Sequence, residues 1–172
     1  MGSNQLTKPQ IIQLMLDNEE LLNEAVMEIY GLDEYIRFIA NTKFRSTSDV
    51  DFEGLYTSGT LDSKNVTAQI DNSVLCELLK DGRIRMISIR RIGSKIHPGE
   101  TDQIRFACNG RGVIDVYEGF YYSKYNKPVT YEGKEWEDPE PEGKGWSIHK
   151  NREYYYSEKI IDHWYYYKRV VN

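Results

Sequence analysis

The C-terminal stretch from Tyr154 to Val171 constrains the fold more than any other part of the sequence. Its 18 residues include seven aromatic and four β-branched aliphatic side chains. Side chains of these kinds suit a pleated, half-buried surface and pack poorly on a helix, so the stretch predicts β-structure. We expect it to end the chain as a central strand.

Both faces of that strand carry aromatic residues, whereas an ordinary half-buried strand alternates apolar with polar residues. Trp164 and Tyr166 fall on one face, and His163, Tyr165 and Tyr167 fall on the other. We expect one face to lie on the main core and the other to lie under a partial cover or in a groove. Tyrosines on the second face either pack with their hydroxyls reaching water or form an aromatic recognition surface.

The N-terminal residues predict helices. Thr7-Lys8-Pro9 is a favourable helix start, because proline is tolerated in the first turn and threonine can cap it. A second start at residues 17–20 places acidic side chains in a first turn, where they face the positive end of the helix dipole. An apolar stripe leads from there to Gly31, a natural C-terminal cap. A third short helix is expected over residues 33–41.

The middle of the chain predicts fewer regular elements. Residues 42–65 are rich in Ser, Thr, Asp and Gly, so we interpret them as a connecting segment with one strand near residues 52–56. A second strand is expected over residues 66–70. Residues 74–79 favour a short helix, and the alternative is a hairpin whose turn contains Asp81-Gly82.

An antiparallel meander of three strands is predicted next, over residues 83–92, 103–108 and 113–117. Asn109-Gly110 predicts the tight turn between the last two, because Asn-Gly adopts positive φ at low cost. Residues 119–122 continue the strand pattern, and a further β segment begins at Trp146.

These elements predict an α+β fold, in which N-terminal helices pack on an antiparallel, aromatic-rich sheet of about five to seven strands. A length of 172 residues fits one domain. We divide it into an N-terminal helical segment, residues 1–42, and an antiparallel β domain, residues 43–172, which together form one compact unit.

The sequence contains no apolar run near 18 residues, and it begins without the charged and apolar regions of a signal peptide. We therefore predict a cytoplasmic protein without a membrane partner. Cys76 and Cys108 are isolated in the sequence. In a cytosolic protein, two isolated cysteines are usually small buried apolar side chains rather than a disulfide or a metal site.

Charge is unevenly distributed along the chain. Residues 1–79 carry 5 basic and 13 acidic side chains, whereas residues 80–111 carry 8 basic and 3 acidic ones. A net charge of −5 argues against general coating of nucleic acid. Basic strands beside aromatics can hold a nucleotide or a single strand. We prefer the other interpretation, in which the acidic N-terminal unit lies over the basic sheet.

Residues 132–145 form an acidic segment that carries Trp136. Pro139 and Pro141 restrict it to extended conformations. Trp136 either folds back on the sheet as a lid or anchors a partner, with the flanking acids steering a basic protein towards it. We expect the lid, because large apolar groups rarely stay exposed on a monomer.

No catalytic or ligand motif stands out. The histidines lack the close spacing of a zinc site, and no phosphate-binding loop occurs. We therefore expect no metal and no cofactor. Acid pairs such as Asp49/Asp51 and Asp115/Glu118 are of the type used in glycosidases and metal-dependent nucleases, but at this acid content such pairs arise by chance. His163 is the best titratable candidate.

The sequence predicts a non-catalytic intracellular protein-binding module, of the inhibitor or immunity type carried by phages and mobile elements. One alternative is a nucleotide or single-stranded nucleic-acid binding protein that uses the basic strands 83–111 and the C-terminal aromatics. The other is a small enzyme with dispersed acidic residues. The expected partner is another protein, and the candidate binding residues are Trp136, Arg90, Arg105, His163, Tyr165 and Tyr167.

Overall fold

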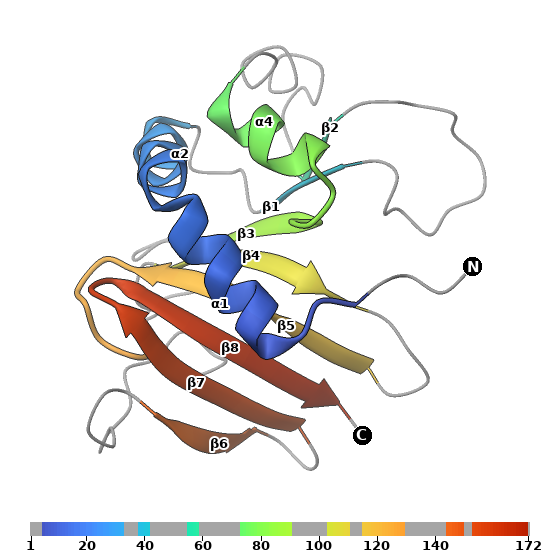
Figure 1. The fold of residues 1–172 in the computed structure, drawn as a ribbon, viewed down its shortest axis with the longest axis vertical. Coiled ribbons are helices and arrows are strands. Elements are labelled where there is room, and N and C mark those ends of the chain that lie inside the picture. Colours follow the sequence, from blue (N-terminus) through green and yellow to red (C-terminus); the bar gives the residue numbers. More distant parts are fainter. Residues whose placement is uncertain are drawn as a thin grey trace.

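The computed structural model describes residues 5–32, 38–41, 55–58, 73–90, 103–110, 115–129, 144–149 and 153–171. The helices in these ranges are α1 (Lys8–Asp17), α2 (Glu19–Gly31) and α4 (Val74–Lys80). The strands are β1 (Phe38–Asn41), β2 (Leu55–Ser58), β3 (Met86–Arg90), β4 (Gln103–Asn109), β5 (Asp115–Ser123), β6 (Gly145–His149), β7 (Glu153–Ile161) and β8 (Trp164–Val171). They form one antiparallel sheet beside the helices (Figure 1), so the predicted α+β fold is confirmed.

The strands follow the order β2-β1-β3-β4-β5-β8-β7-β6. β3, β4 and β5 form the predicted meander, in which Phe106 lies opposite both Ile87 and Phe120. β8 pairs with β5 on one side and β7 on the other, so the last strand of the chain is central, as predicted. The sheet exceeds the expected five to seven strands because β1 and β2 extend it beyond β3.

The predicted third helix over residues 33–41 is wrong at its C-terminal end, where residues 38–41 form β1. Ile39 lies opposite Ile87 of β3 and Thr57 of β2, and it is fully buried. Pairing on both sides and burial of a β-branched side chain outweigh the helical spacing of the sequence. β2 lies close to the strand expected near 52–56, and the strand expected over 66–70 lies outside the described residues.

The C-terminal stretch is a hairpin of two strands, whereas we expected one long final strand. β7 ends at Ile161 and β8 begins at Trp164, with Asp162 and His163 between them. His163 has a φ of 68°, in the left-handed region that histidine visits more often than most residues with a side chain. The aromatic strands on either side contain no Gly or Pro to mark this turn.

The helices begin where the sequence predicts. The Gln10 amide oxygen accepts a 2.8 Å hydrogen bond from the backbone N–H of Thr7, and α2 begins directly after Asn18. The helix over residues 74–80 settles the choice between helix and hairpin. Its first turn is capped by Ser73, whose hydroxyl accepts a hydrogen bond from the backbone N–H of Cys76.

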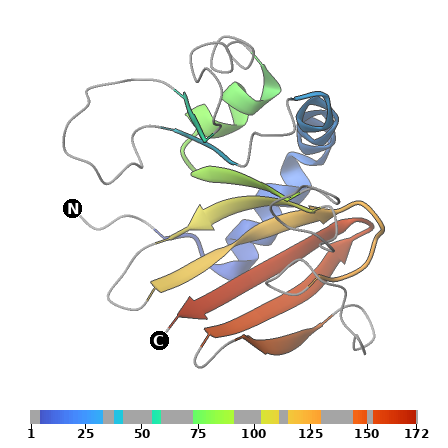
Figure 2. The ribbon, with the colours of Figure 1, turned by 180° about the vertical axis from the view of Figure 1, so that it is seen from behind.

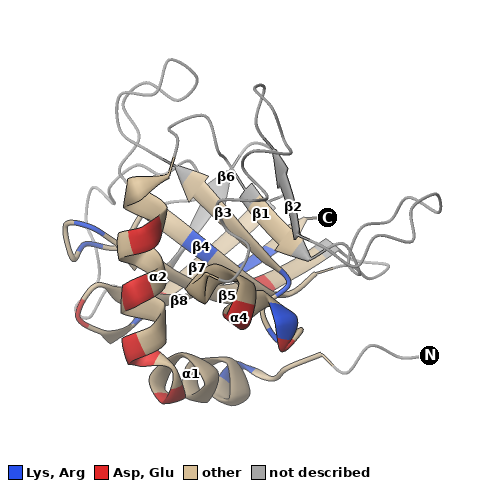
Figure 3. Ribbon diagram, turned by 90° about the horizontal axis from the view of Figure 1, so that it is seen from above, with Lys and Arg blue, Asp and Glu red and all other residues tan. Residues whose placement is uncertain are grey.

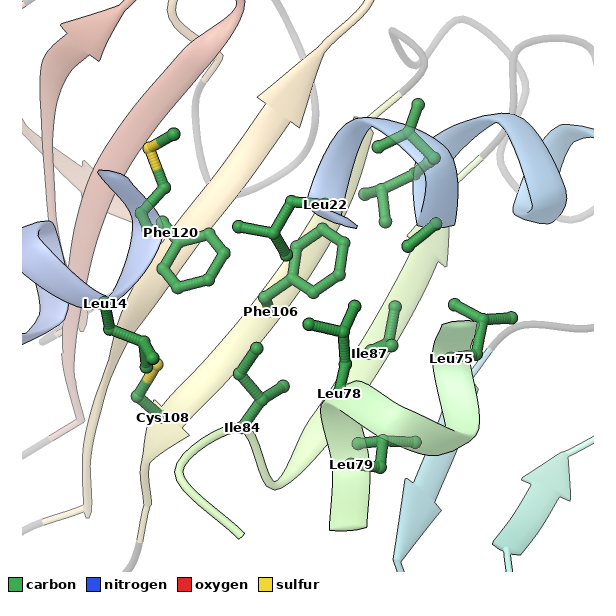
Figure 4. Close-up of a cluster of buried hydrophobic side chains, with 14 of the residues drawn as sticks. Leu14, Leu22, Leu75, Leu78, Leu79, Ile84, Ile87, Phe106, Cys108 and Phe120 are labelled. Atoms are coloured by element: carbon green, nitrogen blue, oxygen red, sulfur yellow. The ribbon is translucent and has the colours of Figure 1, made fainter. Parts of the chain in front are cut away.

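All three helices cover the same face of the sheet, as Figures 1 and 2 show from opposite sides. One core cluster runs from α1 to β8. Figure 4 shows Leu22 and Leu78 of the helices directed towards Phe106 of the sheet. The apolar stripe of α2 therefore faces the sheet, and its polar stripe faces solvent.

The opposite face of the sheet carries a second buried cluster, which we call the tyrosine cluster: Tyr121, Val129, Tyr155, Tyr165 and Tyr167. Tyr121 stacks on Tyr165 with ring centroids 5.2 Å apart, and Tyr155 stacks on Tyr167 at 6.0 Å. The Tyr121 hydroxyl shares a 2.6 Å hydrogen bond with Ser157. The prediction that the second face of β8 is covered is therefore confirmed.

Candidate functional site

The outer surface of α2 is acidic. Residues 9–32 contain five acidic side chains and no Lys or Arg. The buried side chains of α2 face the sheet, so the helical period places Glu20 and Glu24 on the solvent side. Figure 3 shows acidic residues recurring along this helix. We call the exposed set the acidic face: Asp17, Glu19, Glu20, Glu24 and Met27.

Met27 is the most exposed large apolar side chain among the residues that the structure describes, at 72%. It lies three residues after Glu24 and seven after Glu20, so the three share one face of the helix. A single exposed apolar residue is ordinary on a monomer. Methionine, however, is flexible and polarizable, and it is over-used on surfaces that bind other proteins.

A shallow depression of about 460 Å³ lies where α1 meets α2. Its lining consists of residues 16–21 together with Glu24, so acidic side chains dominate its walls. Leu16, which is 40% exposed, adds an apolar side chain to this lining. The acidic face, together with the neighbouring Leu16, thus combines negative charge with two exposed apolar groups and a concave surface.

Three of the predicted binding residues lie together in the interior. The Arg105 guanidinium lies 5.7 Å from the ring centroid of Tyr167 and 5.2 Å from that of Tyr155. Arg105 is 7% exposed, Tyr165 1% and Tyr167 4%. The register Arg105–Tyr121–Tyr165 across three strands brings them together.

Burial sets the protonation of these tyrosines. It raises the pKa of Tyr165 to about 12 and also raises the pKa of Tyr167 above its usual value, so both phenols stay protonated at neutral pH. The Arg105 Nε donates a 2.8 Å hydrogen bond to Gln103 Oε1. The described contacts of these residues are internal packing, and a binding role for them stays a prediction.

His163 fixes the end of the sheet. Its Nδ1 lies 2.9 Å from the Ser123 carbonyl oxygen, and its ring stacks on Tyr122 with centroids 5.4 Å apart. Its backbone N–H donates a 2.7 Å hydrogen bond to Asn126 Oδ1, which also accepts one from the Tyr165 hydroxyl at 3.4 Å. These contacts tie the β7–β8 turn to the residues that follow β5, which is a structural role.

The structure describes only the backbone of Arg90, and it does not describe Trp136, the last two of the predicted binding residues. Arg90 lies opposite Gln103 at the end of β3, but its side chain is outside the described residues, as is all of Trp136. The choice between lid and anchor for Trp136 therefore stays open.

Among the basic residues of 80–111, Arg83 pairs with a neighbouring acid. Its Nε donates a hydrogen bond of 2.7 Å to Asp81 Oδ2, and this contact lowers the pKa of Asp81.

One described ion pair between α1 and the sheet has a basic residue on the helix and an acidic residue on the strand, which is the reverse of the charge arrangement that we preferred. Lys8 of α1 pairs with Glu158 of β7, and its Nζ lies 5.2 Å from the ring centroid of Tyr166. Burial alone would raise the pKa of Glu158, but hydrogen bonds from Lys8 and Tyr156 outweigh it and hold the pKa below its usual range. Glu19, Glu20 and Glu24 of α2 are exposed to solvent.

Glu118 of β5 is a second carboxylate held by hydrogen bonds and an ion pair, and its side chain is less exposed than that of Glu158. It accepts hydrogen bonds from Asn109 Nδ2 at 2.9 Å and the Tyr166 hydroxyl at 3.0 Å, and it pairs with Lys168 at 3.0 Å. Burial alone would raise its pKa, but these three donors outweigh burial and lower it. Glu118 is therefore an ionised structural acceptor. The Asp115 side chain, its predicted pair member, lies outside the described residues.

Both cysteines are free and buried, as predicted. Burial raises the pKa of Cys108 to about 12, so its sulfur remains a thiol and a weak nucleophile at neutral pH. Within the described ranges, no three His, Cys, Asp or Glu side chains gather as a metal ion would require. In the same part of the chain, no helix combines the length and apolar character needed to cross a membrane.

Comparisons with protein families, with curated proteins and with solved structures find no match for this chain.

The acidic face was missing from the sequence-based candidates, although two features of the sequence pointed to it. One was the lack of any Lys or Arg between residues 9 and 32. The other was Met27, which falls outside the apolar stripe of Leu22, Val26 and Ile29 and therefore on the polar side of the helix.

Proposed function

We propose that the protein is a non-catalytic protein-binding module whose acidic face binds a basic protein partner. One observation carries the proposal: the exposed side of α2 presents Glu20 and Glu24 around a 72% exposed Met27, with no basic residue on the helix. An inhibitor or immunity role is the form of binding that the sequence analysis favoured.

The charge of this face supports a basic partner. A cluster of acidic side chains raises the rate of encounter with a positively charged protein and repels acidic proteins. Met27 supports a protein rather than an ion as the ligand, because a mobile apolar side chain contributes to binding by excluding water from a packed contact.

The experiment begins with the tagged protein purified from its native cell and the partner identified by mass spectrometry. Affinity for that partner is then measured with the variant Glu19→Gln/Glu20→Gln/Glu24→Gln. We expect at least about tenfold weaker binding at low salt, and a smaller difference from wild type at high salt.

A matched control removes the same three charges from the other acidic stretch, as Glu135→Gln/Glu137→Gln/Glu140→Gln. The melting temperatures of both variants should stay close to that of the wild type. A change in affinity can then be assigned to the lost charges rather than to unfolding. The proposal fails if the α2 variant binds like wild type. If the control variant loses the partner instead, the Trp136 segment is the binding element.

The nucleic-acid alternative has less support, because Arg105, Tyr165 and Tyr167 are buried. A base could stack on these rings only after they were uncovered. We expect no salt-sensitive change in the fluorescence anisotropy of a labelled single-stranded oligonucleotide at physiological salt. A micromolar response would reverse the order of the two functions.

A further inference from the structure

A small cavity lies beside the acidic face, between α1, α2 and α4. Its volume is about 150 Å³, and its apolar lining comes from Leu14, Leu21, Leu78 and Ile84. Asn18, Glu77, Asp81 and Arg83 supply the polar part of the lining. Figure 4 shows Leu14, Leu78 and Ile84 near one another at one side of the buried core.

The cavity adjoins the acidic depression. Asn18 and Leu21 line both hollows, so the apolar cavity and the acidic surface meet at the joint between α1 and α2. Arg83, the one basic residue among the described residues that line the cavity, is paired with Asp81. The charge around the opening is therefore negative, from the exposed Glu77 and from the acidic face.

Volume limits what the cavity can hold. Pockets for drug-sized ligands and cofactors measure about 300–1,000 Å³. A cavity of about 150 Å³, whose lining includes four aliphatic and four polar side chains, is large enough for benzene, which is close in size to one leucine or phenylalanine side chain. The cavity is thus matched to a single apolar group, and the acidic depression is matched to the charges beside that group.

We propose that the cavity receives one apolar side chain of the partner, presented within a basic segment whose Lys or Arg residues lie on the acidic face. This inference rests on the proposed function and specifies it: the partner segment carries an aliphatic or aromatic anchor between basic residues. A buried apolar anchor inside a charged rim is the usual arrangement of binding energy in a protein interface.

Two synthetic peptides test the inference without the natural partner. One is acetyl-Lys-Lys-Leu-Lys-Lys-amide, and the other replaces its leucine by serine. Each is titrated into protein labelled at the Leu and Ile methyl groups and at the backbone amides, and NMR shifts are recorded. Benzene, an uncharged probe, is titrated separately.

We expect the leucine peptide to shift the methyl signals of Leu14, Leu21, Leu78 and Ile84, and to bind about tenfold more tightly than the serine peptide. Benzene should shift the same methyl groups. The variant Leu21→Phe, which places a larger ring at the cavity wall, should abolish both responses while leaving the amide shifts of α2 intact. Its thermal melt serves as the check on folding.

The inference is overturned if both peptides shift the α2 amides equally and neither the leucine peptide nor benzene shifts a cavity methyl. That result leaves the acidic face as a binding surface and the cavity as a packing void only. The proposed function fails separately if Glu19→Gln/Glu20→Gln/Glu24→Gln binds the leucine peptide as tightly as the wild type does. Shifts of the cavity methyl groups that persist in Leu21→Phe, with the fold intact, also count against the cavity.

Discussion

Trp164 is the side chain whose removal should be most damaging to this fold. It is 1% exposed and lies between the sheet and α2. Its ring centroid lies 5.6 Å from that of Phe106 and 5.9 Å from that of Phe120, and its indole Nε1 donates a 3.1 Å hydrogen bond to Asn23 Oδ1. Trp164→Ala therefore removes the aromatic contact that joins β8 to β4 and β5, together with one link to α2.

The size of the effect follows from the buried area. A buried tryptophan removes about 150–250 Å² from water, and at about 25 cal/mol per Å² this corresponds to about 4–6 kcal/mol. Alanine keeps the Cβ, and the neighbouring side chains relax into part of the space. We therefore expect the free energy of unfolding to fall by about 3–5 kcal/mol.

Two further variants separate the ring from its hydrogen bond. Asn23→Ala removes the acceptor of the Trp164 indole N–H in a partly buried hydrogen bond, so it should lower the free energy of unfolding by about 1–2 kcal/mol. Trp164→Phe keeps an aromatic ring against Phe106 and should lie between the two other variants. This order, with Trp164→Ala the most damaging, is the expected outcome if packing dominates.

Urea unfolding followed by far-UV circular dichroism measures all three variants. For a chain of this length, the loss from Trp164→Ala corresponds to a fall in Tm of roughly 6–20 °C. An unfolding midpoint for Trp164→Ala within error of the wild type would refute the packing argument. Equal effects of Trp164→Ala and Asn23→Ala would assign the stabilisation to the hydrogen bond instead.

Three other perturbations test particular contacts. Gly119→Ala would place a Cβ 2.0 Å from the Phe106 carbonyl oxygen, so it should force β4 and β5 apart and lower stability by about 3 kcal/mol in urea unfolding. The pKa of Glu118 is lowered in the folded state, so its stabilisation is present above pH of about 4.3 and is lost as pH falls through the folded pKa. Glu118→Gln should accordingly lower the urea midpoint at pH 7, and the difference from wild type should shrink at pH 3. At His163, where φ is 68°, glycine relieves the backbone that alanine would strain, so His163→Gly should be less destabilising than His163→Ala by about 1 kcal/mol.

The sequence predicted the elements whose evidence is local. Thr7, Asn18 and Ser73 lie at the starts of α1, α2 and α4, because a cap is decided by a few consecutive residues. The meander of β3, β4 and β5 was predictable for the same reason, since β-branched and aromatic residues are concentrated in short runs.

The elements that the sequence did not predict depend on distant partners. Ile39 lies in a strand because Ile87 and Thr57 pair with it, and nothing within residues 33–41 shows that pairing. The turn at Asp162 and His163 contains no Gly, and part of what holds it is the Asn126 side chain, 37 residues earlier in the chain. A turn stabilised by such a remote residue leaves no mark in its own sequence.

The number of tyrosines in the sequence allowed an aromatic recognition surface, but in the structure many of these tyrosines are buried. The hydroxyl of Tyr121 bonds to Ser157, that of Tyr166 bonds to Glu118, and the ring of Tyr121 stacks on that of Tyr165. These aromatics therefore need no external ligand to explain them. The acids of α2 need an explanation, because a helix that only covers a sheet requires polar residues of either charge on its outer side. The acidic residues around an exposed methionine are consistent with the partner of opposite charge that we propose.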